Sequence, residues 1–407
     1  METLHPREIE LGLGRVQSVG ERMQLAPLPF AIVTVAGTNG KGSTVAMLEH
    51  SLHAAGYKVG AYSSPHLLTY NERVRLAGEP VGDAELCAAF ERVERARAAE
   101  PLTYFEFGTL AAVELFRDSR VDIAVLEVGL GGRLDAVNAW DADVALISSI
   151  GIDHTDWLGD TREAIGREKA GIFRTGRPAI CGDPNPPDSI LEAAARVGAG
   201  LLLVHRDFDF ETNDQSWAWR SRTQRRAGLP YPAMRGKYQL YNASGVLMAL
   251  ELLMARFPVT QADVRAGLLS AVLPGRFQTL PGLPVRVLDV AHNPQAAQAL
   301  AETLRAQRVT GKTYGVVGMF KDKLIADVMR AMAGVIDHWH VAALGGARGA
   351  SVEQLCDALD AAGIRAPIAR HATVTDAYAA ACQAARADDR VVAFGSFHTV
   401  GAILGKV

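Results

Sequence analysis

The segment FAIVTVA at residues 30–36 is followed without a break by GTNGKGST at residues 37–44. A short apolar run rich in β-branched residues predicts a buried strand. The glycines then predict a tight loop, and apolar residues at helical spacing between Ser43 and Ala55 predict a helix, with Ser43 and Thr44 as its N-terminal caps. A strand, a glycine loop and a helix N-terminus present converging backbone N–H groups and a favourable dipole to an anion. The junction therefore predicts a phosphate-binding loop in an α/β fold.

This loop departs from the general phosphate-loop pattern G-x-x-x-x-G-K-[ST]. Val35 stands where the first glycine belongs, and Gly42 follows Lys41. Lys41 still supplies a positive charge for β/γ phosphates, and a loop hydroxyl can serve Mg²⁺. On the loop alone, a glycine turn that only joins a strand to a helix stays open as the alternative.

Length and composition favour an enzyme with two α/β domains. A chain of 407 residues exceeds the size at which a single core usually stops growing, and 49% apolar with 21% charged residues is ordinary for a globular enzyme. The net charge of −3 gives no reason to expect a nucleic-acid or membrane partner. We interpret a local basic cluster as a solvated loop; it comprises Arg220, Arg222, Arg225 and Arg226.

Cysteine spacing and the lack of long apolar runs predict the compartment. The four cysteines are too far apart for a CxxC metal or redox motif, which indicates reduced thiols. METLHPREIE at residues 1–10 has no apolar core of a signal peptide, and no apolar run reaches membrane-spanning length. We expect a cytoplasmic monomer.

Strand-like and helical patterns alternate along the chain, which predicts mostly parallel sheets covered by helices. In the first part, helical patterns occupy 83–99 and 240–256, the pattern weakens around 185–235, and strand-like runs occupy 31–36, 121–128, 143–149 and 178–181. Proline–glycine pairs at 274–275 and 281–282 then interrupt the pattern. Beyond them, strand-like runs occupy 285–290, 314–318, 339–344 and 390–395. We therefore predict an N-terminal domain at 1–274 with a phosphate loop and a mostly parallel sheet, a linker at 275–284 and a smaller Rossmann-like domain at 285–407.

Polar side chains stand at the ends of several predicted strands, where open α/β sheets bind ligands. Glu127 closes an apolar strand and precedes a glycine-rich stretch, His154 follows another strand, and Lys169 lies among small and apolar residues. A lone group of this kind is more often a structural hydrogen-bond partner. Three of them together with a phosphate loop favour a catalytic site.

The C-terminal part repeats this arrangement in DVAHNP at residues 289–294. Asn293 before Pro294 is explained as the N-terminal cap of a helix, but capping does not explain Asp289 or His292. The segment FGSFHT at residues 394–399 either closes a site or only ends a strand.

The loop at 37–43 resembles the variant phosphate loop of the Mur-ligase superfamily. More narrowly, the chain is similar to the bacterial dihydrofolate synthase/folylpolyglutamate synthase family. The resemblance runs in family order over essentially the whole chain and includes the glycine-rich stretch after Glu127 as well as SSPHL (63–67), NERV (71–74), LTYFEFGT (102–109), DHTDWLG (153–159), REKAGIF (167–173), LPGRFQ (273–278), DVAHNP (289–294) and GSFHTV (395–400).

This resemblance implies an ATP-dependent ligase that joins L-glutamate to dihydropteroate and to reduced folates. An acyl phosphate formed from the substrate carboxylate would be attacked by the glutamate amine, so the protein mainly positions groups and neutralises charge. The implied cofactors are ATP and Mg²⁺ at two sites, with Lys169 carbamylated so that it becomes an anion.

The resemblance also implies roles for single residues. The implied catalytic residues are Lys41, Lys169, His292 and Arg276. The implied nucleotide contacts are Thr38, Asn39, Gly40, Lys41, Gly42, Ser43, Asn242 for adenine, Arg276 for phosphate and Asp289 for ribose. The implied metal ligands are Ser64, Glu127, His154 and Lys169, and the implied contacts to the pterin are Thr103, Phe105 and Asp135.

The chain departs from the family at one point. The family often has Asp-Lys-Asp after the glycine-containing strand near 315–320, whereas this chain has Asp322-Lys323-Leu324. Any role of the missing acidic group is therefore in question, but the fold and the ATP site are not.

Three alternatives remain at this stage. A monofunctional folylpolyglutamate synthase would share every motif. A cell-wall Mur ligase would require an additional domain ahead of the phosphate loop. A nucleotide-binding protein without ligase activity would not need Glu127, His154 and Lys169 together.

Overall fold

Strand β1 (Ala31–Ala36) lies inside an eight-stranded sheet with the order β4-β3-β2-β5-β1-β6-β7-β8. The computed structural model describes residues 10–406. The strands from β2 to β8 in this order pair in parallel, and β3 and β4 extend the sheet as an antiparallel hairpin. The remaining strands are β2 (Val59–Tyr62), β3 (Val74–Leu76), β4 (Glu79–Pro80), β5 (Ile123–Glu127), β6 (Val144–Ile147), β7 (Pro178–Cys181) and β8 (Gly200–Leu203).

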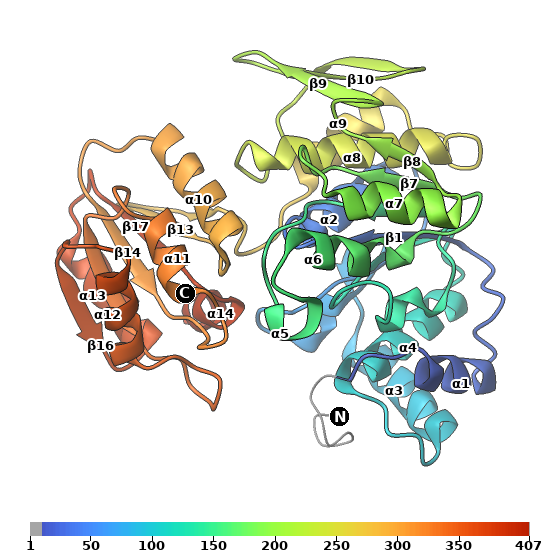
Figure 1. Ribbon diagram of the computed structural model, residues 1–407, viewed down its shortest axis with the longest axis horizontal. Helices are drawn as coiled ribbons and strands as arrows, with labels where there is room; N and C mark the ends of the chain where they lie inside the picture. Colours follow the sequence, from blue (N-terminus) through green and yellow to red (C-terminus); the bar gives the residue numbers. More distant parts are fainter. Residues whose placement is uncertain (1–9, 407) are drawn as a thin grey trace. The chain divides into compact units, whose positions relative to one another are not determined.

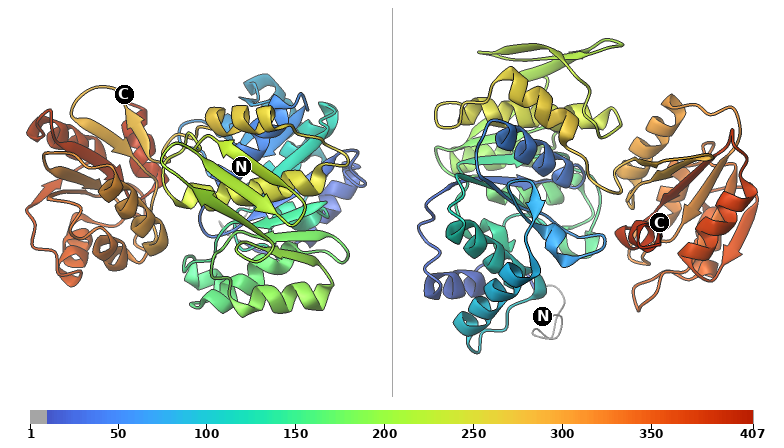
Figure 2. Two further views of the ribbon diagram at one scale, coloured as in Figure 1. Left: turned by 90° about the horizontal axis from the view of Figure 1, so that it is seen from above. Right: turned by 180° about the vertical axis from the view of Figure 1, so that it is seen from behind.

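Helices cover both faces of this sheet because the chain leaves its centre in two directions. It passes from β1 through α2 (Lys41–Ala54) to β2 on one side, and from β6 through α6 (Arg162–Lys169) to β7 on the other. Right-handed crossovers in opposite directions place their helices on opposite faces. Figures 1 and 2 show α6 and α7 (Asp188–Val197) on the face opposite α2. The other helices of this part are α1 (Gly14–Arg22), α3 (Asp83–Arg97), α4 (Tyr104–Asp118), α5 (Thr155–Leu158), α8 (Tyr238–Leu253), α9 (Gln261–Ser270) and the short η1 (Tyr70–Arg73), η2 (Ala136–Ala139) and η3 (Ala170–Ile172).

The expected α/β fold with a mostly parallel sheet is confirmed. The runs at 31–36 and 178–181 form strands with those bounds, and the runs at 121–128 and 143–149 form shorter strands at 123–127 and 144–147. The strand β6 ends just before Ser148, and β5 ends at Glu127, two residues before Gly129.

The prediction that Ser43 and Thr44 cap the first helix is wrong. Helix α2 begins at Lys41, and its N-cap is Gly40 with a left-handed backbone, at φ 87°. Because glycine adopts this conformation readily, the chain turns into the helix earlier than the hydroxyl residues suggest. Ser43 and Thr44 are buried within the first turns of the helix.

The region around 185–235, where the sequence pattern weakens, holds regular structure. Besides α7 and β8, it forms a three-stranded antiparallel sheet of β9 (Phe208–Thr212), β10 (Trp217–Ser221) and β11 (Arg225–Leu229). Figures 1 and 2 show this sheet beside α8 and α9, and Ser221 Oγ donates to the Glu251 carboxylate on α8 at 2.7 Å.

The interpretation of the arginine cluster as a solvated loop is therefore wrong. Arg220, Arg225 and Arg226 belong to strands, and only Arg222 lies in the turn between them. Arg226 is buried and donates to the carbonyl oxygen of Val259 at 3.0 Å. Strands of five residues joined by a polar turn are too short to give a clear periodic signal.

A second sheet contains six strands in the order β12-β13-β17-β14-β15-β16 and is parallel except for β12. Its strands are β12 (Gln278–Leu280), β13 (Val285–Leu288), β14 (Thr313–Val317), β15 (His338–Ala342), β16 (Ile368–His371) and β17 (Arg390–Phe394). Its helices are α10 (Pro294–Ala306), α11 (Ile325–Ala331), α12 (Val352–Ala361), α13 (Val374–Ala384) and α14 (Phe397–Leu404). An apolar core of side chains from α10, α11 and α12 packs against Trp339, Val341 and Phe394 of this sheet.

Contacts between residues divide the chain into two compact units. The second unit comprises 272–407 together with 152–154 and 234–238, and the first holds the rest. Within the segment expected to be a linker, residues 278–280 form β12 at the edge of the second sheet. The boundaries of 274 and 284 stay predictions.

Among residues 10–406, none of the helices combines the length and the apolar character that a bilayer crossing requires. The N-terminal stretch used in the expectation of a cytoplasmic location lies almost wholly in residues 1–9, outside the described residues.

Gly40 provides a test of the loop. A Cβ at this position would lie 2.4 Å from Oδ1 of Asn242, whereas Gly56, with a similar φ of 90°, has nothing within 4 Å of the equivalent position. G56A should therefore lose only about 1–2 kcal/mol of stability through its left-handed backbone. G40A should lose more stability and bind ATP about tenfold or more weakly, as a loss of roughly 1.4 kcal/mol in binding free energy implies. Thermal melts and ATP titrations measure both effects. Equal behaviour of the two variants would contradict the close packing of the loop.

Candidate functional site

The phosphate loop at residues 37–40 is held by the end of β6. The Thr38 N–H donates to the carbonyl oxygen of Ser149 at 2.7 Å. The hydroxyls of Ser148 and Ser149 both donate to the Asn39 carbonyl oxygen, at 2.6 and 3.0 Å. The Thr38 hydroxyl donates to the Gly151 carbonyl oxygen and accepts from the Gly151 N–H, each at 3.0 Å. Sequence reasoning placed Ser148 and Ser149 at a strand end but missed their role in shaping the loop.

Two lysines predicted from the sequence meet at one backbone oxygen. Nζ of Lys41, the first residue of α2, donates to the Gly37 carbonyl oxygen at 3.0 Å and to that of Thr38 at 3.2 Å. Nζ of Lys169, the last residue of α6, donates to the same Gly37 oxygen at 2.9 Å, and its side chain is 4% exposed. Two ammonium groups that donate to one oxygen repel each other, and Lys169 is buried, so negative charge beside them is favoured. The geometry suits an anion such as phosphate.

Helix α8 packs against the other side of the loop. Gln239 Nε2 donates to the Ser43 hydroxyl at 3.2 Å, and Asn242 Nδ2 donates to Gln239 Oε1 at 2.9 Å. Asn242, predicted to contact adenine, thus lies next to Gly40. Sequence reasoning missed Gln239, whose only signal is an amide within an apolar helix.

Glu127 and Ser64 form an oxygen-rich corner at the same edge of the sheet. Glu127 ends β5 and is 3% exposed, and its Oε2 accepts from the Ser64 N–H at 3.4 Å. Because β2, β5 and β1 are parallel neighbours, their carboxyl ends bring Ser64, Glu127 and the loop together. A hydroxyl and a carboxylate suit Mg²⁺, which usually takes its remaining ligands from water and phosphate.

The fourth predicted metal ligand, His154, is exposed and belongs to the second unit. Within residues 10–406, no group of three or more His, Cys, Asp or Glu side chains is placed to hold a metal ion by itself. Ser64 and Glu127 therefore fit a metal that is completed by substrate phosphates more closely than an all-protein cage.

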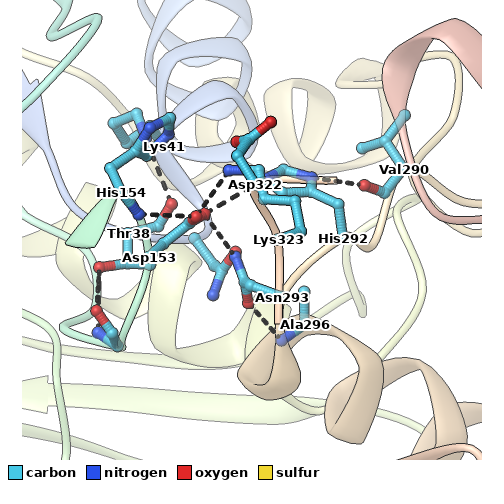
Figure 3. A network of polar contacts seen from close by, with 12 residues as sticks. Thr38, Lys41, Asp153, His154, Val290, His292, Asn293, Ala296, Asp322 and Lys323 are labelled. Atoms are coloured by element: carbon cyan, nitrogen blue, oxygen red, sulfur yellow. Dashed lines mark hydrogen bonds and ion pairs between the residues drawn. The ribbon is translucent and has the colours of Figure 1, made fainter. Parts of the chain in front are cut away.

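In the second unit, Asp153 is the centre of a polar network (Figure 3). One carboxylate oxygen accepts from Lys323 Nζ at 2.6 Å; the other accepts from Asn293 Nδ2 at 3.0 Å and lies 3.3 Å from His292 Nε2. Burial alone would raise the pKa of Asp153, but its hydrogen bond to His292 and the charges of His292, His154 and Lys323 hold that pKa well below its usual range.

His292 has an acceptor at each ring nitrogen. Nδ1 lies 2.8 Å from the Val290 carbonyl oxygen, and Nε2 faces the Asp153 carboxylate. The two ring nitrogens of His292 therefore lie between a backbone carbonyl oxygen and a carboxylate, which fixes the orientation of the ring. Within Asp322-Lys323-Leu324, where the sequence differs from the family pattern, Lys323 pairs with Asp153. Leu324 is exposed and does not cap α11 with its side chain.

Arg276, Asp289 and Asn293 are also in this unit. The Arg276 guanidinium lies 4.9 Å over the ring of Phe397, which joins two motifs that are far apart in sequence. Asp289 is buried, accepts from the N–H groups of Phe277 and Ala291 at 2.8 Å each, and has a pKa raised by burial. Asn293 caps α10 with Pro294 in its first turn, as expected.

The three residues predicted to contact the pterin all lie near the start of α4 or after β5. Thr103 caps α4 by accepting from the Glu106 N–H, and the Phe105 ring lies against Gly129, where a Cβ would be 2.7 Å from the ring. Asp135 caps η2 and accepts from the N–H groups of Val137 and Leu130, at 3.1 and 2.8 Å. Thr103 and Asp135 therefore also cap helices, a structural role that the sequence did not indicate.

Comparisons with known proteins match both parts of the chain. The chain matches the Mur ligase middle domain over residues 35–250 and the Mur ligase glutamate ligase domain over 275–397. It is 45% identical to the dihydrofolate synthase/folylpolyglutamate synthase of Escherichia coli (strain K12), over 99% of this chain and 93% of that protein.

Solved structures give the same picture. The structure of E. coli FolC in complex with DHPP and ADP superposes with a TM-score of 0.94 at 44% identity, covering 100% of this chain and 95% of that one. A bifunctional folylpolyglutamate synthase/dihydrofolate synthase with Mn, AMPPNP and L-glutamate bound superposes with a TM-score of 0.92 at 46% identity, covering 100% and 95%.

Asp135 gives a pH-dependent prediction. Burial raises its pKa to about 7 in the folded protein, well above its ordinary value. The folded state therefore binds this proton more tightly than the unfolded state, and stability falls as pH rises from about 4 to about 7. The change D135N removes this effect, so the Tm of the variant relative to wild type should be higher near pH 8 than near pH 5.

Thermal melts at the two pH values measure this difference. The matched control is D160N, at an exposed aspartate, which should shift Tm equally at both. A D135N shift that does not depend on pH would show that the Asp135 carboxylate does not resist ionisation.

Proposed function

The chain belongs to the Mur ligase family, and from this premise we propose that it is an ATP-dependent ligase that joins L-glutamate to dihydropteroate, giving dihydrofolate, and to reduced folates. The reaction proceeds through an acyl phosphate. One observation carries the proposal: Lys41 and Lys169 converge on the Gly37 carbonyl, at the same sheet edge as the buried Glu127.

The chemistry explains why such a site is needed. A carboxylate does not react with an amine because oxide is a poor leaving group. When its oxygen attacks the γ-phosphorus of ATP, the bond to ADP breaks and an acyl phosphate forms. The glutamate amine then attacks the acyl carbon, phosphate leaves, and the nitrogen loses a proton to give the amide. Each step gathers negative charge, so fixed cations and N–H donors stabilise it.

The first unit supplies the phosphate contacts in this proposal. Lys41 and the backbone N–H groups of the loop bind the β and γ phosphates, and Asn242 contacts the adenine. The loop residues involved are Thr38, Asn39, Gly40, Lys41, Gly42 and Ser43. The second unit contributes Arg276 to the phosphates, Asp289 to the ribose and His292 to the phosphate region.

Mg²⁺ neutralises charge on the phosphates when bound. Ser64, Glu127 and His154 would hold one ion, and Lys169 would hold a second after carbamylation. The adjacency of Ser64 and Glu127 supports the first site. Carbamylation is supported by the crowding of two ammonium groups at Gly37, because it replaces one cation with an anion.

The folate-type substrate lies near Thr103, Phe105 and Asp135. The flat face of Phe105 suits stacking on the pterin. Asp135, with its pKa near neutrality, can share a proton with the amidine-like edge of that ring. We further propose two domains, at 1–274 and 285–407, joined by a linker at 275–284. The protein acts as a monomer in the cytoplasm, without a nucleic-acid or membrane partner.

An assay of ADP release tests the proposal. Purified protein receives ATP, Mg²⁺ and L-glutamate with either dihydropteroate or tetrahydrofolate. We expect both folate-type substrates to stimulate ADP release. K41A should lower the rate about a hundredfold or more, as removal of a charge-stabilising group does. K321A, at an exposed lysine, is the matched control and should keep the wild-type rate.

Stimulation by tetrahydrofolate alone would restrict the protein to folylpolyglutamate synthesis. ATP binding without stimulation by either substrate would contradict the proposal and favour a nucleotide-binding protein without ligase activity.

A further inference from the structure

The segment between β2 and β3 is folded by its own polar side chains. Glu72 accepts hydrogen bonds from three consecutive backbone N–H groups at 2.7–2.8 Å, those of Leu67, Leu68 and Thr69. Asn71 Nδ2 donates to the Val81 carbonyl oxygen at 2.8 Å, and Val74 is completely buried. Packing therefore accounts for three members of the motif Asn71-Glu72-Arg73-Val74, and Arg73 is left to be explained.

Arg73 is a buried cation with unused donors. It is 8% exposed, and its Nε donates to Nδ1 of His66 at 2.8 Å. Its guanidinium lies 5.3 Å from the ring centroids of both Tyr70 and Tyr104. Among residues 10–406, neither Nη1 nor Nη2 has a hydrogen bond or an ion pair with the protein. The hydroxyl of Tyr70, in the same cluster, is also buried without a hydrogen-bond partner in this part of the chain.

Although Arg73 is 8% exposed as a whole, Nη1 and Nη2 are not among the fully buried atoms without a partner, so they remain accessible to a ligand. The two tyrosine faces attract the cation, but they do not satisfy the N–H groups at its edge. Since Nε of Arg73 can only donate, Nδ1 of His66 accepts, which fixes the plane of the guanidinium. The remaining N–H groups form a fork that matches the two oxygens of a carboxylate.

Arg73 also lies close to residues that the proposed function assigns to the folate-type substrate. Tyr104, against which Arg73 packs, stands between Thr103 and Phe105 in the first turn of α4. The Phe105 ring lies 5.7 Å from that of Tyr62 at the end of β2. The segment between β2 and β3 also begins beside Glu127, because the Ser64 N–H donates to the Glu127 carboxylate.

We propose that Arg73 forms a subsite for the carboxylate of the folate-type substrate. The subsite binds this group through Nη1 and Nη2, while His66, Tyr70 and Tyr104 hold the guanidinium in place. The inference rests on the proposed function and names a specificity-determining residue within it. The subsite selects substrates that carry a carboxylate over pterins that lack one.

Equilibrium binding without ATP tests this subsite. Dihydropteroate and its decarboxylated analogue are titrated into wild type, R73M and R95M, the last being the same substitution at an exposed arginine of α3. Wild type and R95M should bind dihydropteroate about tenfold or more tightly than the analogue, as a charge-assisted bidentate contact implies. R73M should bind both ligands equally and weakly. R73K, which keeps the charge without the fork, should fall between.

A thermal melt distinguishes this role from a structural one. R73M keeps an apolar side chain of similar length against Tyr70 and Tyr104, so its Tm should stay close to that of wild type. Unchanged preference for dihydropteroate in R73M, or in R73K if R73M does not fold, would overturn the subsite. A higher KM for glutamate alone would also overturn it. These binding results do not depend on turnover, so they are separate from a failure of wild-type ADP release, which would contradict the proposed function itself.

Discussion

Two lysine ammonium groups donate to a single carbonyl oxygen, that of Gly37, and the candidate site is arranged around this contact. Lys41 begins α2 on one face of the sheet and Lys169 ends α6 on the other. Their repulsion at the carboxyl end of β1 makes this point a place where negative charge is stabilised. In the proposed function, substrate phosphate and a carbamate on Lys169 would supply this negative charge, and the loop and the distant lysine would belong to one site.

The surrounding structure keeps this contact in place. A Cβ on Gly37 would lie 2.0 Å from the Ser148 hydroxyl, and one on Gly40 would meet Asn242, so both glycines are needed for close approach. Ser148 and Gln239 hold the loop from β6 and α8. The glycines around Lys41 do not follow the general phosphate-loop pattern. Their positions are instead required by close neighbours, Ser148 beside Gly37 and Asn242 beside Gly40.

The sequence predicted β1, β5, β6 and β7 of the first sheet and β13, β14, β15 and β17 of the second, because buried parallel strands are continuous apolar runs. It did not predict the shorter strands β2, β3, β4, β8, β12 and β16. It also predicted the cap at Asn293, which is a local effect. It failed where the structure depends on distant contacts. Helix α2 begins after Gly40 and not at the expected caps Ser43 and Thr44. The short strands around Trp217 are separated by polar turns and gave no periodic pattern. The sequence did not reveal the roles of Gln239 and Ser148, since these roles depend on residues more than a hundred positions away. The roles of single site residues stay predictions.

The central claim is that the substrate carboxylate is activated by phosphorylation before glutamate attacks. Dihydropteroate carrying a heavy oxygen isotope in its carboxylate tests this directly, with ATP, Mg²⁺ and L-glutamate present. Transfer through an acyl phosphate predicts that one labelled oxygen appears in the released inorganic phosphate at each turnover, as mass spectrometry would detect. Dihydrofolate formation with unlabelled phosphate would contradict the account.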